Sequence, residues 1–177
     1  MKLLKVFDSK NYLDNYEPFE RHACRGIIIK DKKIAMVKSN LGYYKFPGGG
    51  IEKGETKKEA LIREVLEETG LQVKEQTIKE FGYTYEKRRS IYDEKGFNLD
   101  LDRIFIQYSY YFLCECEEKV LSQRLFDYEI DESYTLEFID IDKALEANNN
   151  YQEEIDTFII RDNYILQLLK GVINNEK

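Results

Sequence analysis

The chain has 177 residues, 42% of them apolar, and a formal net charge of −7. These values suit one buried core, so we expect a single domain over residues 1–177, with residues 1–21 as an N-terminal extension. The acidic balance argues against nonspecific binding to nucleic acid backbones, and we expect no DNA partner. No apolar run approaches the ~18 residues of a membrane span, and no signal sequence is evident. We therefore expect a cytoplasmic protein without membrane contact.

The first part of the chain predicts strands that lead to a glycine-rich turn. These segments are Leu3–Phe7, Arg25–Lys30, Ile34–Lys38 and the approach to the turn, Leu41–Phe46. Tyr43 and Tyr44 lie just before the turn, where they are candidates for substrate binding by stacking on a nucleobase. Cross-strand aromatic packing is the alternative, and the sequence does not separate the two.

A helix follows the turn, and both of its ends are marked in the sequence. Thr56 and Glu59 form a capping box, which starts the helix at about Lys57. Gly70 is placed to stop it in a left-handed conformation. The helix is therefore about three and a half turns long. Its buried stripe is predicted to contain Ala60, Leu61 and Val65.

Three carboxylates project from one face of this helix. Glu64, Glu67 and Glu68 are three or four residues apart, so they repel one another, and the helix macrodipole disfavours anions near its C-terminal end. A cation is needed to stabilise them, and Arg63 alone cannot neutralise the cluster. Mg²⁺ prefers oxygen ligands and fits such a cluster without histidine or cysteine. For an isolated pair of glutamates, a solvated acidic face would be the better interpretation.

The segment Gly49–Leu71 matches every fixed position of the Nudix box, with Gly49, Glu55 and the run Arg63–Leu71 in register. The chain therefore resembles the Nudix hydrolase superfamily. The resemblance implies an α/β fold, namely a Nudix-type α/β/α sandwich around a mixed β-sheet. It also implies a metal-dependent enzyme that cleaves the pyrophosphate bond of a nucleotide by attack of water on phosphorus. The substrate would be a nucleoside diphosphate linked to another moiety, or a nucleoside triphosphate.

The resemblance also implies roles for single residues. Oxygen ligands to Mg²⁺, with Mn²⁺ as an alternative, would come from Gly49 (its carbonyl), Glu64, Glu67 and Glu68. Arg63 would hold one of these glutamates by a charge-assisted hydrogen bond, and Glu55 would support the loop. Many members recruit a further acid from a later loop as a metal ligand or general base. Here the candidates are Glu129 and Glu132.

The second part of the chain predicts more strands, two polar loops and helices. The strands are Gln72–Tyr85, Arg103–Cys116 and Tyr134–Ile141, the loops are Ser90–Asp102 and Glu117–Ser133, a short helix is stopped by Asn148–Asn150, and an amphipathic C-terminal helix covers Tyr151–Val172. A basic run precedes the first loop and is a candidate for binding substrate phosphates, with a solvated loop as the alternative. Its residues are Lys87, Arg88 and Arg89.

Two other functions remain open. One is a nucleotide-metabolite sensor without catalytic activity, although all box carboxylates are present. The other is an RNA 5′-end pyrophosphohydrolase, although the chain is acidic and shows no basic face. Exposed strands and tyrosines would allow a homodimer. Cys24, Cys114 and Cys116 are predicted to be reduced thiols with packing roles.

Overall fold

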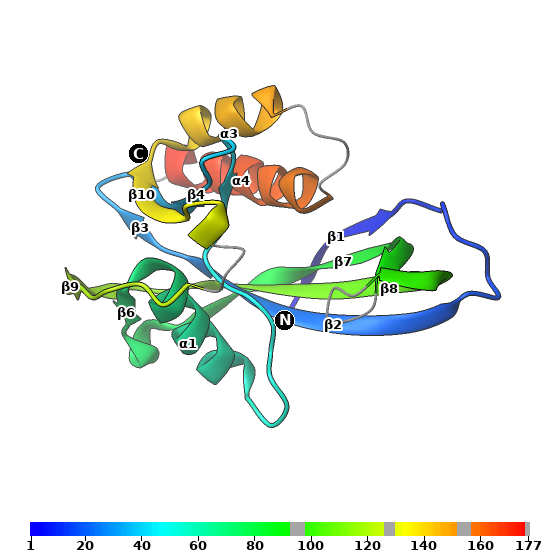
Figure 1. Ribbon diagram of the computed structural model, residues 1–177. Coiled ribbons are helices and arrows are strands. Elements are labelled where there is room, and N and C mark those ends of the chain that lie inside the picture. The colour runs from blue at the N-terminus through cyan, green and yellow to red at the C-terminus, as the bar shows by residue number, and fades with distance from the viewer. Residues whose placement is uncertain (93–97, 126–129, 152–156, 176–177) are drawn as a thin grey trace.

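Figure 1 shows a computed structural model of the protein, which describes residues 1–92, 98–125, 130–151 and 157–175. The strands are β1 (Leu3–Asp8), β2 (Glu17–Ile27), β3 (Ile29–Lys30), β4 (Lys33–Lys38), β5 (Tyr44–Lys45), β6 (Leu71–Val73), β7 (Lys79–Tyr92), β8 (Asn98–Leu113), β9 (Cys116–Val120) and β10 (Thr135–Ile139). The helices are α1 (Lys57–Thr69), the 3₁₀ turn η1 (Glu75–Thr77), α3 (Ile141–Asn150) and α4 (Thr157–Asn175). None of the helices in these described parts is long and apolar enough to cross a membrane.

The strands form mixed sheets with helices on two sides. The largest sheet has the order β1-β7-β8-β2, in which β1 and β2 run parallel to their neighbours while β7 and β8 are antiparallel. A second sheet has the order β10-β4-β3, with β5 paired to β4. In Figure 1, α1 lies below the strands, and α3 and α4 lie above them. This arrangement confirms the predicted α/β fold.

Two apolar cores lie on opposite sides of the strands. Successive strand residues point to opposite faces, and Tyr111 accordingly packs with α3 and α4, whereas Phe112 packs with α1. Ile27 and Ile28 are divided between the same two cores. These strands therefore read as nearly continuous apolar runs because both of their faces are buried.

Helix α1 begins and ends where the sequence predicts. Thr56 accepts from Glu59 N, and Glu59 accepts from Thr56 N, which completes the capping box. Gly70 closes the helix with φ +73° and donates to Leu66 O at 2.8 Å. A Cβ atom at Gly70 would clash with the carbonyl of Leu121, so both the backbone angle and the space require glycine.

Three boundary predictions were wrong, each because a contact distant in sequence decides the structure. β2 begins at Glu17, inside the expected N-terminal extension, because it pairs with β8. The loop expected at Ser90–Asp102 is largely strand, since β7 pairs with β8 from Lys79 to Tyr92; residues 93–97 lie outside the described part. β9 occupies part of the expected acidic loop and pairs with β6.

The short helix ends within the asparagine triplet, as the sequence predicts, because α3 runs to Asn150. Asn148 lies on its buried side, where its amide exchanges hydrogen bonds with the backbone N–H and carbonyl of Tyr44 at 2.7 and 3.0 Å. α4 is described from Thr157 to Asn175, and residues 152–156 of the predicted helix lie outside the described part. The amphipathic character of α4 is confirmed by buried Ile165, Leu166 and Leu169.

Candidate active site

The glycine-rich segment runs along the edge of β2 and forms one wall of the site. Cys24 N donates to Gly49 O at 2.9 Å, and Gly26 N donates to Pro47 O at 2.8 Å. These bonds hold the glycine backbone in extended contact with the strand. Pairing with the edge of β2 therefore fixes the position of the glycine segment opposite α1.

Helix α1 presents two of its carboxylates to this glycine backbone. Glu64 is 8% exposed and Glu68 is 2% exposed, and both line the same pocket. Gly48 N donates to Glu68 Oε2 at 2.7 Å. A Cβ atom at Gly49 would clash with the Glu64 carboxylate. The close approach of helix and turn thus requires a glycine at position 49.

Arg63 joins the carboxylates into one network. Its Nε and Nη2 donate to the two oxygens of Glu55 at 2.7 and 2.8 Å. Its Nη1 donates to Glu64 at 2.8 Å and to Glu67 at 3.1 Å, and Nη2 also donates to Gly50 O at 2.9 Å. Glu67 lines a second hollow on the helix surface rather than the main pocket. Arg63 therefore orients two helix carboxylates, while Glu55 supports the loop.

A second cation comes from β5. Lys45 Nζ lies 2.8 Å from Glu68 Oε1, and both side chains are largely buried. Burial raises the pKa of Glu64 above the ordinary value of a glutamate, and the hydrogen bond from Arg63 opposes this shift. The sequence singled out Arg63 alone as a protein cation. The structure adds Lys45, which the pairing of β5 with β4 brings to the carboxylates.

The donor atoms of the site are of the type that hard divalent ions prefer. Glu64, Glu68 and the Gly49 carbonyl supply oxygen ligands, and the described contacts of Glu64 use only its Oε1. Within the described residues, no three acidic, histidine or cysteine side chains form a group that could hold a metal ion. Arg63 and Lys45 hold the carboxylates instead. The oxygen donors thus suit a hard divalent ion, and such an ion would have to displace Lys45 from Glu68.

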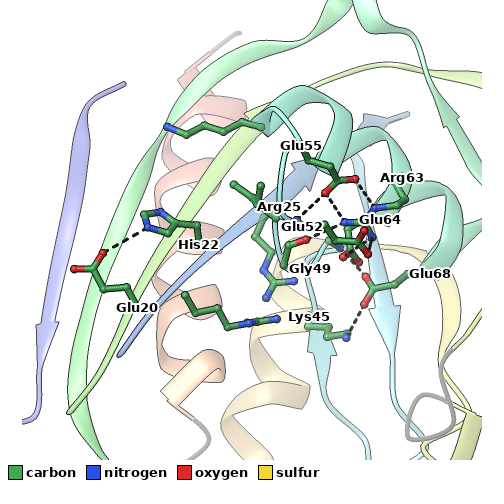
Figure 2. Close-up of a pocket in the computed structure, with 15 residues that line it drawn as sticks. Glu20, His22, Arg25, Lys45, Gly49, Glu52, Glu55, Arg63, Glu64 and Glu68 are labelled. Carbon is green, nitrogen blue, oxygen red and sulfur yellow. Dashed lines mark hydrogen bonds and ion pairs between the residues drawn. The ribbon is translucent and has the colours of Figure 1, made fainter. Parts of the chain in front are cut away.

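The main pocket has a volume of about 1170 Å³ and combines these carboxylates with basic side chains (Figure 2). The basic residues on its wall are Arg21, Arg25, Lys45, Lys57 and Arg63. Arg21 and Arg25 were not singled out in the sequence. They are four residues apart within β2, so they lie on one face of the strand. The sequence held one indication of this role, namely that Arg25 is a charged residue at the start of an apolar strand.

The two tyrosines before the turn do not line the pocket. Tyr43 is buried, packs edge-on against Tyr151 and Phe158, and donates to Glu132. Tyr44 is also buried and donates to Glu137 at 2.9 Å. The structure therefore favours packing over nucleobase stacking, with Tyr43 against aromatic rings and Tyr44 in the apolar core beside α3 and α4.

The basic run on β7 also lies outside the residues that line the pocket. Lys87 stacks on Tyr12, Arg88 pairs with Glu86, and Arg89 pairs with Asp102. These residues belong to a paired strand rather than a loop. Their predicted role in phosphate binding has no support from their placement.

The candidate loop acids are only partly described. Glu129 lies outside the described residues. Glu132 accepts hydrogen bonds from Tyr43 and from Ser39, the latter at 3.1 Å, and it does not line the pocket. The hydroxyl of Tyr134 hydrogen-bonds the hydroxyl of Tyr43. The centre of the Tyr134 ring lies 4.0 Å from Lys45 Nζ. Glu132 is therefore connected to the site through two tyrosines and a lysine.

Comparison with known proteins identifies the family. The model of the NUDIX domain matches residues 20–158, more than half of the chain, so the protein belongs to the NUDIX domain family. A NUDIX hydrolase from Nitrosomonas europaea has a similar structure, with a TM-score of 0.51 and 18% identity, over 81% of this chain and 88% of that one. At this identity the likeness concerns the fold alone.

Two relatives carry names that describe reactions. An ADP-ribose pyrophosphatase of Methanocaldococcus jannaschii is 43% identical over 74 residues, which are 40% of this chain and 43% of the relative. An RNA pyrophosphohydrolase of Erythrobacter litoralis is 33% identical over 63 residues, 32% of this chain and 38% of the relative. The chain thus matches less than half the length of each relative.

Proposed function

We propose that the protein is a metal-dependent hydrolase that cleaves the pyrophosphate bond of a small nucleotide substrate. The substrate is a nucleoside diphosphate linked to another moiety, or a nucleoside triphosphate. The observation that carries this proposal is the placement of buried Glu64 and Glu68 against a glycine backbone, in a pocket that also contains basic side chains. The names of the two relatives, both of which cleave pyrophosphate bonds, support the same class of reaction.

In this proposal the oxygen ligands to Mg²⁺ or Mn²⁺ are Glu64, Glu68 and the Gly49 carbonyl. Glu67, which lines the neighbouring hollow, would have to turn toward the ion to become a further ligand. Arg63 keeps Glu64 and Glu67 oriented through its Nη1. When bound, the ion would neutralise phosphate charge and lower the pKa of the attacking water.

The general base is proposed to come from the acidic loop, with Glu129 and Glu132 as candidates. Glu132 would have to exchange its hydrogen bonds with Tyr43 and Ser39 for one to the attacking water. We also propose a cytoplasmic location. A homodimer stays a prediction, which light scattering of the purified protein would test.

Substrate class is tested by hydrolysis of a panel in Mg²⁺ with identification of the products. The panel contains sugar nucleotides, dinucleotides, ADP-ribose, canonical and oxidised nucleoside triphosphates, and RNA with a 5′-triphosphate. We expect Mg²⁺-dependent release of a nucleoside monophosphate from at least one small nucleotide. Turnover of RNA alone would favour the second candidate, which the name of the Erythrobacter relative suggests. Tight binding without turnover of any compound would indicate a sensor.

The metal assignment is tested by Glu68→Gln. Loss of an outer-shell partner already costs about 10- to 100-fold, so loss of this ligand should lower kcat about 100-fold or more. The amide preserves the shape of the side chain but leaves Lys45 as a largely buried charge without its partner, so the thermal unfolding midpoint should fall. The two kcat values are therefore compared at a temperature at which circular dichroism shows both proteins folded. Glu146→Gln, at an exposed position of α3, is the matched control. Full activity of Glu68→Gln would exclude Glu68 as a metal ligand.

A further inference from the structure

One basic side chain of the pocket wall has a buried donor atom for which the described residues provide no acceptor. Arg25, on β2, is 8% exposed and lines the main pocket. Its Nε is buried, and none of the described residues accepts a hydrogen bond from it. Buried charged groups are normally paired, because the loss of water is otherwise uncompensated. The position of Arg25 therefore requires an explanation.

Other cations of the same wall are engaged by the protein. Arg63 holds glutamates and Lys45 holds Glu68. Lys57 Nζ lies 3.6 Å from the centre of the Tyr110 ring. Arg25 differs from them because its Nε faces no acceptor within the described structure. Figure 2 shows its guanidinium between Gly49 and Lys45, directed into the pocket beside the α1 carboxylates.

We propose that Arg25 binds non-bridging oxygens of the substrate diphosphate. The inference rests on the proposed function and assigns the phosphate-binding role to β2 rather than to the basic run of β7. A guanidinium presents several N–H donors in one plane, which matches two oxygens of a phosphate group. The diphosphate would then lie between Arg25 and the metal ligands Glu64 and Glu68. Its negative charge supplies an acceptor for Arg25 Nε, which has none among the described residues.

The test is the affinity for imidodiphosphate, a diphosphate analogue that resists hydrolysis, measured by calorimetry in Mg²⁺. Arg25→Gln should weaken this affinity about tenfold or more, which corresponds to the loss of one charge-assisted hydrogen bond. The affinity for Mg²⁺ alone should not change. Arg25→Met keeps the apolar stem of the side chain in place and should show the same loss. Arg103→Gln, an arginine of β8 outside the pocket wall, is the control and should bind as the wild type does.

Thermal unfolding separates this role from a structural one. If Arg25 is retained for the ligand, both variants should unfold at temperatures no lower than the wild type, and imidodiphosphate with Mg²⁺ should stabilise them less. Unchanged affinity in either variant would overturn the proposal, and so would a wild type that does not bind imidodiphosphate. Failure of the proposed function has a different signature: no compound of the panel is hydrolysed, while imidodiphosphate binding still depends on Arg25.

Discussion

Lys45 and Glu68 form an ion pair at the pocket wall, with 14% and 3% of their side chains exposed. The lysine neutralises a carboxylate that shares its surroundings with Glu64, since each glutamate lines the same pocket. A buried ion pair stabilises a fold only modestly, but removal of one partner leaves an uncompensated charge. In the protein without a bound metal ion, Lys45 therefore neutralises the carboxylate that we propose as a metal ligand.

This residue-scale view predicts the behaviour of Lys45→Met. Without metal, the free energy of unfolding should fall by about 3–5 kcal/mol, because Glu68 becomes an unpaired buried charge. Mg²⁺ should then stabilise the variant more than the wild type, since no ammonium group competes for Glu68. Urea unfolding with and without Mg²⁺ measures both effects.

The matched control is Lys38→Met. Lys38 pairs with Glu137 at 3.3 Å, but both side chains are well exposed, and such surface pairs contribute about 0–1 kcal/mol. Equal stabilisation of the Lys45 variant and the wild type by Mg²⁺ would show that the ion does not replace the lysine at Glu68.

At the scale of the element, α1 is the part of the site that local chemistry builds. Its N-terminus depends on the reciprocal hydrogen bonds of Thr56 and Glu59, and its C-terminus depends on Gly70. The register of the helix, set by these ends, decides that Glu64 and Glu68 face the glycine backbone. All of these determinants lie within a few residues of one another, which is why the sequence predicts the helix bounds correctly.

The capping box leads to a prediction for Thr56→Ala. The free energy of unfolding should fall by about 0.5–2 kcal/mol, because the amide of Glu59 loses its acceptor. Denaturant unfolding measures the change. Lys58→Ala alters an exposed residue of the same first turn and should have a much smaller effect. If both variants lose the same stability, the cap does not determine the start of α1.

At the scale of the whole molecule, α4 is tied to the backbone just before the glycine turn. Asp162 is fully buried and accepts from Phe46 N at 3.1 Å, from Tyr111 at 2.9 Å and from Arg161 at 3.1 Å. Arg161 also pairs with Glu86 of β7 at 3.7 Å. This network connects the C-terminal helix with β7 and β8 of the largest sheet and with the backbone that follows β5. It therefore stabilises the backbone that leads into the glycine turn, although Arg161 and Asp162 do not line the pocket.

The network predicts a large effect of Asp162→Ala. The variant should lose about 3–5 kcal/mol of unfolding free energy, because Arg161 keeps a buried charge with fewer partners. Urea unfolding gives this value. Asp142→Ala removes an aspartate whose partner Lys170 is exposed, and it should cost about 1 kcal/mol or less. A loss of that small size in Asp162→Ala would show that α4 does not depend on the network.

The sequence by itself determined α1, the glycine turn and the spacing of Glu64, Glu67 and Glu68, because helix geometry depends on residues within four positions of one another. It also identified the correct family through that same segment. The tertiary structure alone decided that Arg25 and Lys45 reach the pocket, whereas the run Lys87–Arg89 does not. Pairing between distant strands and the burial of one face or the other decide these placements, and neither is encoded in the spacing of nearby residues.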